Sequence, residues 1–193
     1  MLNEIEIYAK ENNVPIMLKD GIEFLCNYIK ENNIKSILEI GSAIGYSSIK
    51  MALVNDDIKV TTIEKNKSRY DIAISNINKF NLGNRITILN EDALISNIEG
   101  KFDLIFIDAS KGNNINFFNK YKDNLNKKGV IVTDNLSFHG LVEDETLVET
   151  KNQRGLVNKI KNYLEFLDNN TEFSTTYVSV GDRISISIRN EDL

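Results

Sequence analysis

The chain has 193 residues, of which 41% are hydrophobic and 26% are charged, and 23 Lys+Arg against 28 Asp+Glu give a formal net charge of −5 at pH 7. This composition excludes collagen-like, fibrous and disordered proteins, because the apolar residues can bury a core that offsets the lost chain entropy. The acidic balance argues against nonspecific wrapping of nucleic acid, which usually requires a basic domain. We expect one globular domain, residues 1–193.

Neither an export signal nor a membrane span is predicted. Glu4 and Glu6 stand where a secretory signal would need a basic segment followed by an apolar run. No stretch reaches the roughly 18 apolar residues of a membrane-spanning helix. Cys26 is the only cysteine, which excludes an internal disulfide and a zinc site built from several cysteines. We expect a cytoplasmic protein without a membrane partner.

The chain is predicted to begin with helices over residues 1–34, packed on a core over residues 35–193. Apolar residues from Leu18 to Ile29 recur at helical spacing. Short apolar stretches then alternate with amphipathic ones, which predicts strands at 36–40, 59–63, 85–89, 102–107 and 129–133 and helices at 46–53, 67–80 and 114–125. This succession requires right-handed crossovers and a parallel sheet covered on both faces. The predicted fold is a doubly wound α/β fold.

The pattern changes after about residue 150. A helix at 155–167 precedes two alternating stretches, 174–180 and 183–189, which have the period of strands. Gly181 and Asp182 supply the turn between them. The two stretches therefore predict an antiparallel hairpin at the edge of the sheet, which brings the mostly parallel sheet to seven strands.

Ligands of such sheets bind beyond the carboxyl ends of the strands, so the residues that follow each strand are the candidate site. Gly41 and Gly45 follow the first strand in a turn that lacks the GxGxxG spacing, and this turn could hold a ligand or be only a tight connection. Glu64 could bind both ribose hydroxyls of an adenosine-bearing cofactor or serve as a helix N-terminal charge. Asp92 could contact adenine or cap a following helix.

The fourth and fifth strands are followed by the most specific residues. Asp108 follows one of them, and the pair Asp134 and Asn135 follows the other, so three oxygen donors meet at one edge of the sheet. Oxygen ligands favour Mg²⁺, Mn²⁺ or Ca²⁺ over zinc. Lys111 stands three residues after Asp108. Each of these residues alone would be read as a turn or cap residue, but together they predict a metal site.

Four segments carry a family resemblance: ILEIGSAIGYSSIKMA at 37–52, TTIEKNKSRYDIA at 61–73, FDLIFIDASK at 102–111 and IVTDN at 131–135. The chain resembles the S-adenosylmethionine- and divalent-metal-dependent O-methyltransferases of the catechol and caffeoyl-CoA type over roughly residues 15–189. The resemblance implies a Rossmann-like class I methyltransferase fold and a homodimer.

The resemblance also implies roles for individual residues. The cofactor S-adenosylmethionine would be held at its methionine part by Glu39, Gly41, Tyr46 and Ser47, at its ribose by Glu64, and near its adenine by Asp92, with Asp108 adjoining. The metal, Mg²⁺ or else Mn²⁺ or Ca²⁺, would be bound by Asp108, Asp134 and Asn135. Lys111 would be the catalytic lysine, with Asp108 beside it.

The acceptor of the methyl group is less defined. This chain has no Trp and one Pro, whereas family members that bind phenolics usually carry specificity loops with Trp or Pro. Residues 153–163, Thr175 and the turn at 180–182 resemble the bacterial branch that methylates 5-hydroxyuridine in tRNA, whose O5 and O4 offer a metal adjacent oxygens. The basic run at 151–161 would then contact phosphate or be a solvated helix face.

Three classes of function remain open from the sequence. We favour a metal-assisted O-methyltransferase that acts on tRNA 5-hydroxyuridine, with a catechol-like small molecule as the alternative acceptor. A nicotinamide-dependent oxidoreductase is disfavoured by the missing GxGxxG, and a noncatalytic binding protein would not need Lys111 or the pair Asp134 and Asn135. The role of His139, the sole histidine, stays open.

Overall fold

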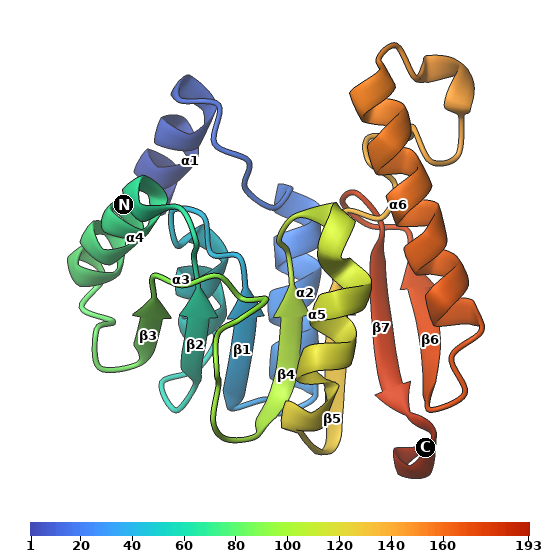
Figure 1. Cartoon of the computed structure of the whole chain (residues 1–193). Coiled ribbons are helices and arrows are strands. Elements are labelled where there is room, and N and C mark those ends of the chain that lie inside the picture. The colour runs from blue at the N-terminus through green and yellow to red at the C-terminus, as the bar shows by residue number, and fades with distance from the viewer.

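A seven-stranded sheet organises the structure, a computed structural model that describes residues 1–193. The strand order is β3-β2-β1-β4-β5-β7-β6 (Figure 1). Strands β1 to β5 are parallel, whereas β7 pairs antiparallel with both β5 and β6. The strands are β1 (Ser36–Ile40), β2 (Lys59–Ile63), β3 (Ile86–Leu89), β4 (Phe102–Ile107), β5 (Leu125–Thr133), β6 (Phe173–Val178) and β7 (Ile184–Arg189).

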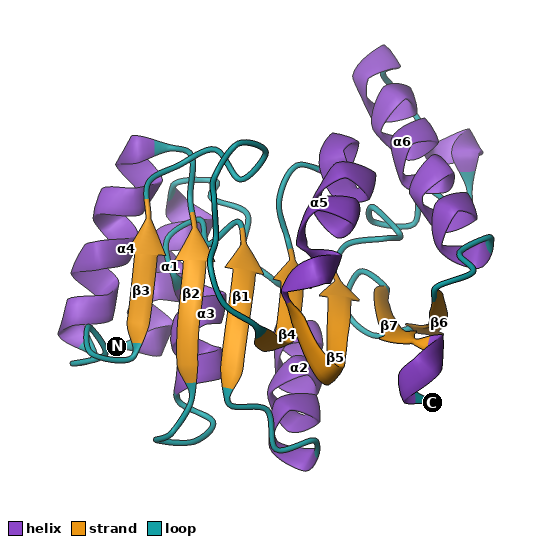
Figure 2. Ribbon diagram, turned by 60° about the horizontal axis from the view of Figure 1, so that its bottom comes forward, coloured by secondary structure: helices purple, strands orange, loops and turns teal.

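Helices cover both faces of this sheet (Figure 2). One face packs against α1 (Leu2–Glu11), α2 (Lys19–Glu31), α3 (Tyr46–Ala52) and α4 (Lys67–Lys79). The other packs against α5 (Asn114–Tyr121) and α6 (Lys151–Asp168). The strand β1 illustrates the alternation, because Ile37 belongs to the first core and Leu38 to the second, and both are fully buried.

The predicted doubly wound fold with an antiparallel C-terminal hairpin is confirmed. Three boundaries differ from the prediction by four residues. The helix predicted to end at 125 ends at Tyr121 and is followed by a 3-10 turn, and β5 begins at Leu125 rather than at 129. Residues 126–128 are polar, so the apolar pattern did not predict this part of the strand. The register of β5 against β4 is also irregular here.

The helix α6 begins at Lys151, four residues before its predicted start. Thr150 is its N-cap, and its hydroxyl oxygen accepts the N–H of Gln153 (3.1 Å). The side chain of Gln153 in turn accepts the N–H of Thr150 (2.9 Å). This capping box satisfies N–H groups that the first turn of a helix leaves free, so the helix can begin before its apolar pattern does.

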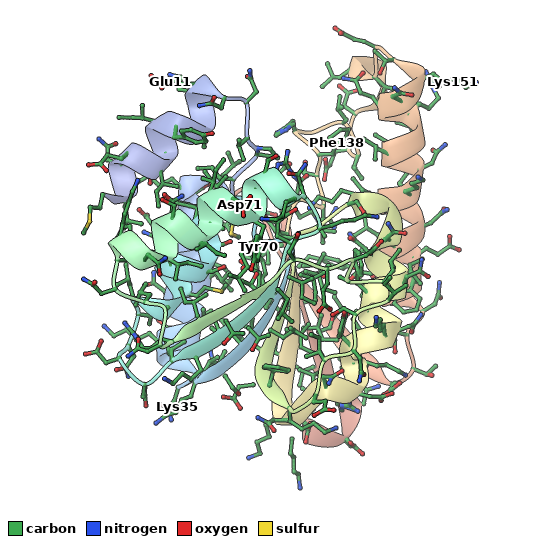
Figure 3. The ribbon with its side chains drawn as sticks, turned by 60° about the vertical axis from the view of Figure 1, so that its left-hand side comes forward. Glu11, Lys35, Tyr70, Asp71, Phe138 and Lys151 are labelled. Atoms are coloured by element: carbon green, nitrogen blue, oxygen red, sulfur yellow. The ribbon has the colours of Figure 1, made fainter.

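The carboxyl ends of β1 to β5 lie at one edge of the sheet, and other elements rise beyond this edge on two sides. These elements are α1 with its following loop and the N-terminal half of α6 (Figure 1). Figure 3 shows Glu11, Phe138 and Lys151 at this end of the molecule and Lys35, which precedes β1, at the other. None of the helices combines the length and apolar content that a membrane crossing needs.

Candidate active site

A cavity of about 580 Å³ opens at the carboxyl edge, over the point between β1 and β4 where the strand order reverses. Nine of the ten residues predicted for the site line it: Gly41, Tyr46, Ser47, Glu64, Asp92, Asp108, Lys111, Asp134 and Asn135. The tenth, Glu39, does not. The structure therefore brings residues from five strand ends into one cavity.

The turn after β1 requires glycine at position 41, because the backbone there lies close to the backbone at the end of β4. Gly41 has a φ of 97°, and a Cβ added there would lie 2.5 Å from the carbonyl oxygen of Asp108. Any other residue would need both a left-handed conformation and a displaced β4 end. The turn thus fixes the distance between the first and fourth strand ends.

The carboxylate of Glu64, which is 7% exposed, holds the glycine turn from the side of β2. Its Oε2 accepts the N–H of Ala43 (2.9 Å), and its Oε1 accepts the N–H of Asn66 (2.7 Å). Carboxylate oxygens have further lone pairs, so these bonds leave acceptor capacity toward the cavity. The residue both shapes the turn and lines the cavity.

Glu39 lies beneath the cavity and does not line it. Its side chain is fully buried, and it accepts hydrogen bonds from the hydroxyls of Ser47, Ser48 and Thr62. Burial raises its pKa to about 7, and the three hydroxyl donors oppose that rise. Glu39 therefore reaches the cavity only through Ser47, which lines the cavity wall, and its predicted part in binding the methionine moiety stays a prediction.

Asp92 lies at the cavity wall and caps a turn. No helix follows it before β4, so the alternative reading as a helix cap is wrong. Its Oδ1 accepts the N–H of Leu94 (3.0 Å), and its Oδ2 pairs with the Nζ of Lys65 (2.7 Å). The lysine, together with the N–H of Leu94, holds the pKa of Asp92 below its usual range.

The predicted oxygen donors Asp108, Asp134 and Asn135 line the cavity at the ends of β4 and β5, and two of their atoms lack partners. Asp134 is 4% exposed, and its Oδ1 is buried without a hydrogen-bond partner. The Oδ1 of Asn135 is likewise buried and unpartnered. An unsatisfied buried oxygen costs free energy, and a hard cation would satisfy both atoms. The structure contains no cluster of three or more His, Cys, Asp or Glu side chains that could hold a metal ion. A cation bound by Asp108 and Asp134 would therefore need the amide oxygen of Asn135 as its third protein ligand.

Lys111 joins the two carboxylate-bearing strand ends. Its Nζ donates to the Oδ1 of Asp108 (3.0 Å) and to the backbone oxygen of Asp134 (3.2 Å). Its side chain is 12% exposed, so this ion pair is shielded from water. Burial raises the pKa of Asp134 to about 7, and the charge of Asp108 adds to the rise while Lys111 opposes it.

Several residues that line the cavity were not among the predicted site residues. They include Pro15 to Leu18, in the loop after α1, Asp182, and His139, whose role had stayed open. Tyr46 donates its hydroxyl hydrogen to the Oε1 of Glu6 (2.6 Å), which ties α1 to the cavity wall. Asp182 was assigned only to a turn, because its place in the site depends on β7 lying beside β5.

The basic run at 151–161 lies on α6, and only some of its cations lack an acidic partner. Lys161 pairs with Glu145, whereas Lys151, Arg154 and Lys159 are exposed. Lys159 lies against Gly112 and lines a second hollow of about 370 Å³. That hollow shares Ala109, Ser110, Lys111 and Asn113 with the main cavity. One cation of the run therefore adjoins the site.

Comparison with known proteins identifies the class. The chain matches the model of the O-methyltransferase family over residues 1–190, and it belongs to that family. The caffeoyl-CoA O-methyltransferase of Populus kitakamiensis is 26% identical over 94% of this chain and 81% of its own length. That of Petunia hybrida is 33% identical over 71% of this chain and 61% of its own length.

Solved structures agree. A Staphylococcus aureus protein provisionally named a caffeoyl-CoA O-methyltransferase has a TM-score of 0.93 at 36% identity, with 98% of this chain and 92% of that chain covered. A Bacillus cereus O-methyltransferase in complex with SAH has a TM-score of 0.82 at 28% identity, covering 98% and 90%. The prediction of an S-adenosylmethionine-dependent O-methyltransferase of the caffeoyl-CoA type is confirmed.

The raised pKa of Asp134 predicts how the stability of the metal-free protein depends on pH. A carboxyl whose pKa is 3.8 when unfolded and about 7 when folded binds its proton more tightly in the folded state, so it lowers stability as pH rises between those values. Asp134→Asn removes this loss. Relative to wild type, the variant should therefore gain stability from pH 4 to pH 8 in EDTA, by at most about 4 kcal/mol.

Urea unfolding at the two pH values measures this difference, with Asp123→Asn on an exposed turn as the control. An equal effect of Asp134→Asn at both pH values would show that this carboxyl does not titrate with folding.

Proposed function

We propose that the protein transfers a methyl group from S-adenosylmethionine to one of two adjacent oxygens of its acceptor, assisted by a divalent cation. The observation that carries the proposal is the pair of buried, unpartnered oxygens on Asp134 and Asn135 beside the carboxylate of Asp108. Buried acceptors are usually hydrogen-bonded, so unpartnered oxygens on adjacent residues that line a cavity mark a place where a ligand would complete their bonding.

The methyl donor is assigned to the half of the cavity formed by the ends of β1, β2 and β3. The carboxylate of Glu64 accepts hydrogen bonds from the ribose hydroxyls, and Asp92 lies at the adenine end. Gly41, Tyr46 and Ser47 contact the methionine part, with Glu39 holding Ser47 from beneath. The buried hydroxyl of Ser42, which lacks a partner, is a further contact for the polar methionine end. Asp108 adjoins this half through Gly41.

The cation is assigned to Asp108, Asp134 and Asn135, with Mg²⁺ as the first choice and Mn²⁺ or Ca²⁺ as alternatives. When bound, it would supply positive charge that favours the ionised form of the acceptor hydroxyl. Two carboxylates offset most of that charge. Lys111 adds a fixed ammonium, held by Asp108, that stabilises negative charge on the acceptor oxygen.

We propose 5-hydroxyuridine of tRNA as the acceptor. Lys159 lies in the hollow that continues from the cavity, and Lys151 and Arg154 are exposed on the part of α6 beyond the sheet edge. Phosphates that flank a nucleotide bound in the cavity would meet these cations. The overall charge of −5 does not oppose this, because six of the 28 acidic residues line the cavity, more than the excess of acids over bases.

A small phenolic acceptor is the second candidate. It is favoured by the relatives named caffeoyl-CoA O-methyltransferases, whose named substrate also carries adjacent phenolic oxygens and phosphates. The two acceptors share the chelating oxygens and differ in the length of the phosphate-bearing part. Cations far from the cavity therefore discriminate between them.

Asp134→Ala tests the division of the cavity. Turnover should fall by at least about 10³-fold, because one carboxylate of the cation set is lost, whereas the affinity for S-adenosylhomocysteine should change less than about threefold. Calorimetry and a radiolabel methylation assay measure the two quantities. An equal loss of both would contradict separate roles for the two halves.

The acceptor is tested with Lys151→Glu combined with Arg154→Glu. Methylation of hypomodified tRNA should fall about tenfold or more and lose part of its salt dependence, while methylation of caffeoyl-CoA, where it occurs, should be unchanged. Lys79→Glu, an exposed lysine at the far end of α4, is the control. Unchanged tRNA methylation in the double variant would remove the α6 surface from tRNA binding.

A further inference from the structure

The segment that connects β3 to β4 forms part of the cavity wall without a helix or strand of its own. Its residues Glu91 to Leu94 all line the cavity. A connection of this kind keeps its backbone in one place only where other parts of the chain bind its polar groups. The contacts that hold Glu91 to Leu94 therefore decide what this wall presents to a ligand.

The beginning of the segment is tied to the end of β2. The side-chain amide of Asn90 donates to the backbone oxygen of Glu64 (2.8 Å). Two residues further on, the backbone oxygen of Asp92 accepts the N–H of Ser96 (2.9 Å). These bonds fix the backbone as far as Asp92, and the next carbonyl group, that of Ala93, is held from a different element.

Two side chains of α5 bind the backbone oxygen of Ala93. The hydroxyl of Tyr121 donates to it (2.6 Å), and so does the Nζ of Lys120 (2.8 Å). Tyr121 is 1% exposed, so this anchor is shielded from water. Burial lowers the pKa of Lys120, and the charges of Asp92 and Glu91 oppose that fall. Both lone pairs of one carbonyl oxygen are thus engaged by α5.

This anchor also acts on the carboxylate of Asp92. The carbonyl of Ala93 and the N–H of Leu94 belong to one trans peptide group, in which the two point in opposite directions. Holding the carbonyl toward α5 therefore directs the N–H of Leu94 away from α5. That N–H donates to the Oδ1 of Asp92 (3.0 Å). The two side chains of α5 thus orient, through a single peptide group, a carboxylate of the cavity wall.

The wall offers an acceptor and a donor on consecutive residues. The acceptor is the carboxylate of Asp92, and the donor is the N–H of Ala93, which bonds to no other group of the chain. Adenine carries the complementary pair on one edge, because its N6 amino group donates and its N1 accepts. Hypoxanthine has an oxygen at C6 and a hydrogen on N1, so it reverses both groups.

We propose that Tyr121 and Lys120 are positioning residues that make the cofactor site selective for adenine. This rests on the proposed function, which assigns Asp92 to the adenine end. Neither side chain lines the cavity, so both act through the backbone of Ala93. With that backbone held, the wall fits an amino group beside an unprotonated ring nitrogen and opposes the reversed pair.

Calorimetric titration with S-adenosylhomocysteine, and with its analogue in which hypoxanthine replaces adenine, measures this selectivity. The wild-type protein should bind the adenine compound at least about 10²-fold more tightly. In Lys120→Met combined with Tyr121→Phe, this preference should fall about tenfold or more, while the affinity for the hypoxanthine compound changes less than about threefold. An undiminished preference in the double variant would overturn the proposal.

The control makes the same two changes elsewhere. Lys122→Met combined with Tyr163→Phe removes an ammonium that pairs with Glu172 and an equally buried hydroxyl that bonds with that of Thr133 (2.8 Å). Its preference should equal that of the wild-type protein, because neither group binds the segment. An equal fall in the control would show a general loss of structure and would overturn the specific role.

The single substitutions at Lys120 decide the question if the double variant does not fold. Lys120 is only half-buried, so its substitution leaves the buried hydroxyl of Tyr121 in place. Lys120→Met should lower the preference about threefold, whereas Lys120→Arg, which can donate to the same carbonyl, should retain it. Equal preferences in these two variants would overturn the role of Lys120 as a donor to Ala93.

Asp92→Ala separates this proposal from the proposed function. Loss of the preference in Asp92→Ala supports the placement of adenine at this wall. If the wild-type protein shows no preference, or if Asp92→Ala keeps it, the placement of the adenine end is wrong and the role of α5 falls with it. If Asp92→Ala loses the preference and the double variant keeps it, only the role of Tyr121 and Lys120 is overturned.

Discussion

The close approach of Gly41 to Asp108 is the constraint on which the site depends. The two strands β1 and β4 are neighbours at the point where strand order reverses, and a Cβ on residue 41 would lie 2.5 Å from the carbonyl oxygen of Asp108. The glycine turn therefore lies directly against the strand end that carries Asp108 and Lys111. The methyl donor proposed for the turn and the acceptor proposed for the carboxylates would thereby share one cavity, and such proximity is a major part of methyl-transfer catalysis.

The two halves of the cavity differ in how their carboxylates are satisfied. On the side proposed for the cofactor, Glu64 accepts the N–H groups of Ala43 and Asn66, and the hydroxyl of Ser42 is the unpartnered group. The acceptor side keeps a buried carboxylate of raised pKa at Asp134 and a left-handed loop from Asn135 to His139. Groups that lower the stability of the empty protein are expected where a ligand completes the structure.

Much of the fold could be predicted from local patterns, because each parallel strand is an apolar stretch bounded by polar turns. The bounds of β1, β2 and β4 agree with the prediction. The start of β5 at Leu125 was missed because the polar residues after it interrupt the apolar pattern. The start of α6 could have been predicted, because Thr150 and Gln153 form a capping box that is visible in the sequence. Among the site residues, Glu39 was placed at the ligand because sequence spacing does not distinguish a cavity wall from the layer beneath it. The place of Asp182 in the cavity could not be found from the sequence, because it depends on β7 lying between β5 and β6.

The central claim is that Asp108, Asp134 and Asn135 hold a divalent cation as one set. Electron paramagnetic resonance of free Mn²⁺ titrated with the protein measures this directly, independent of any acceptor. The account predicts one Mn²⁺ per chain for the wild-type protein and its loss in Asn135→Leu, with the affinity for S-adenosylhomocysteine retained in both. No bound Mn²⁺ in the wild-type protein, or undiminished binding in the variant, would contradict it.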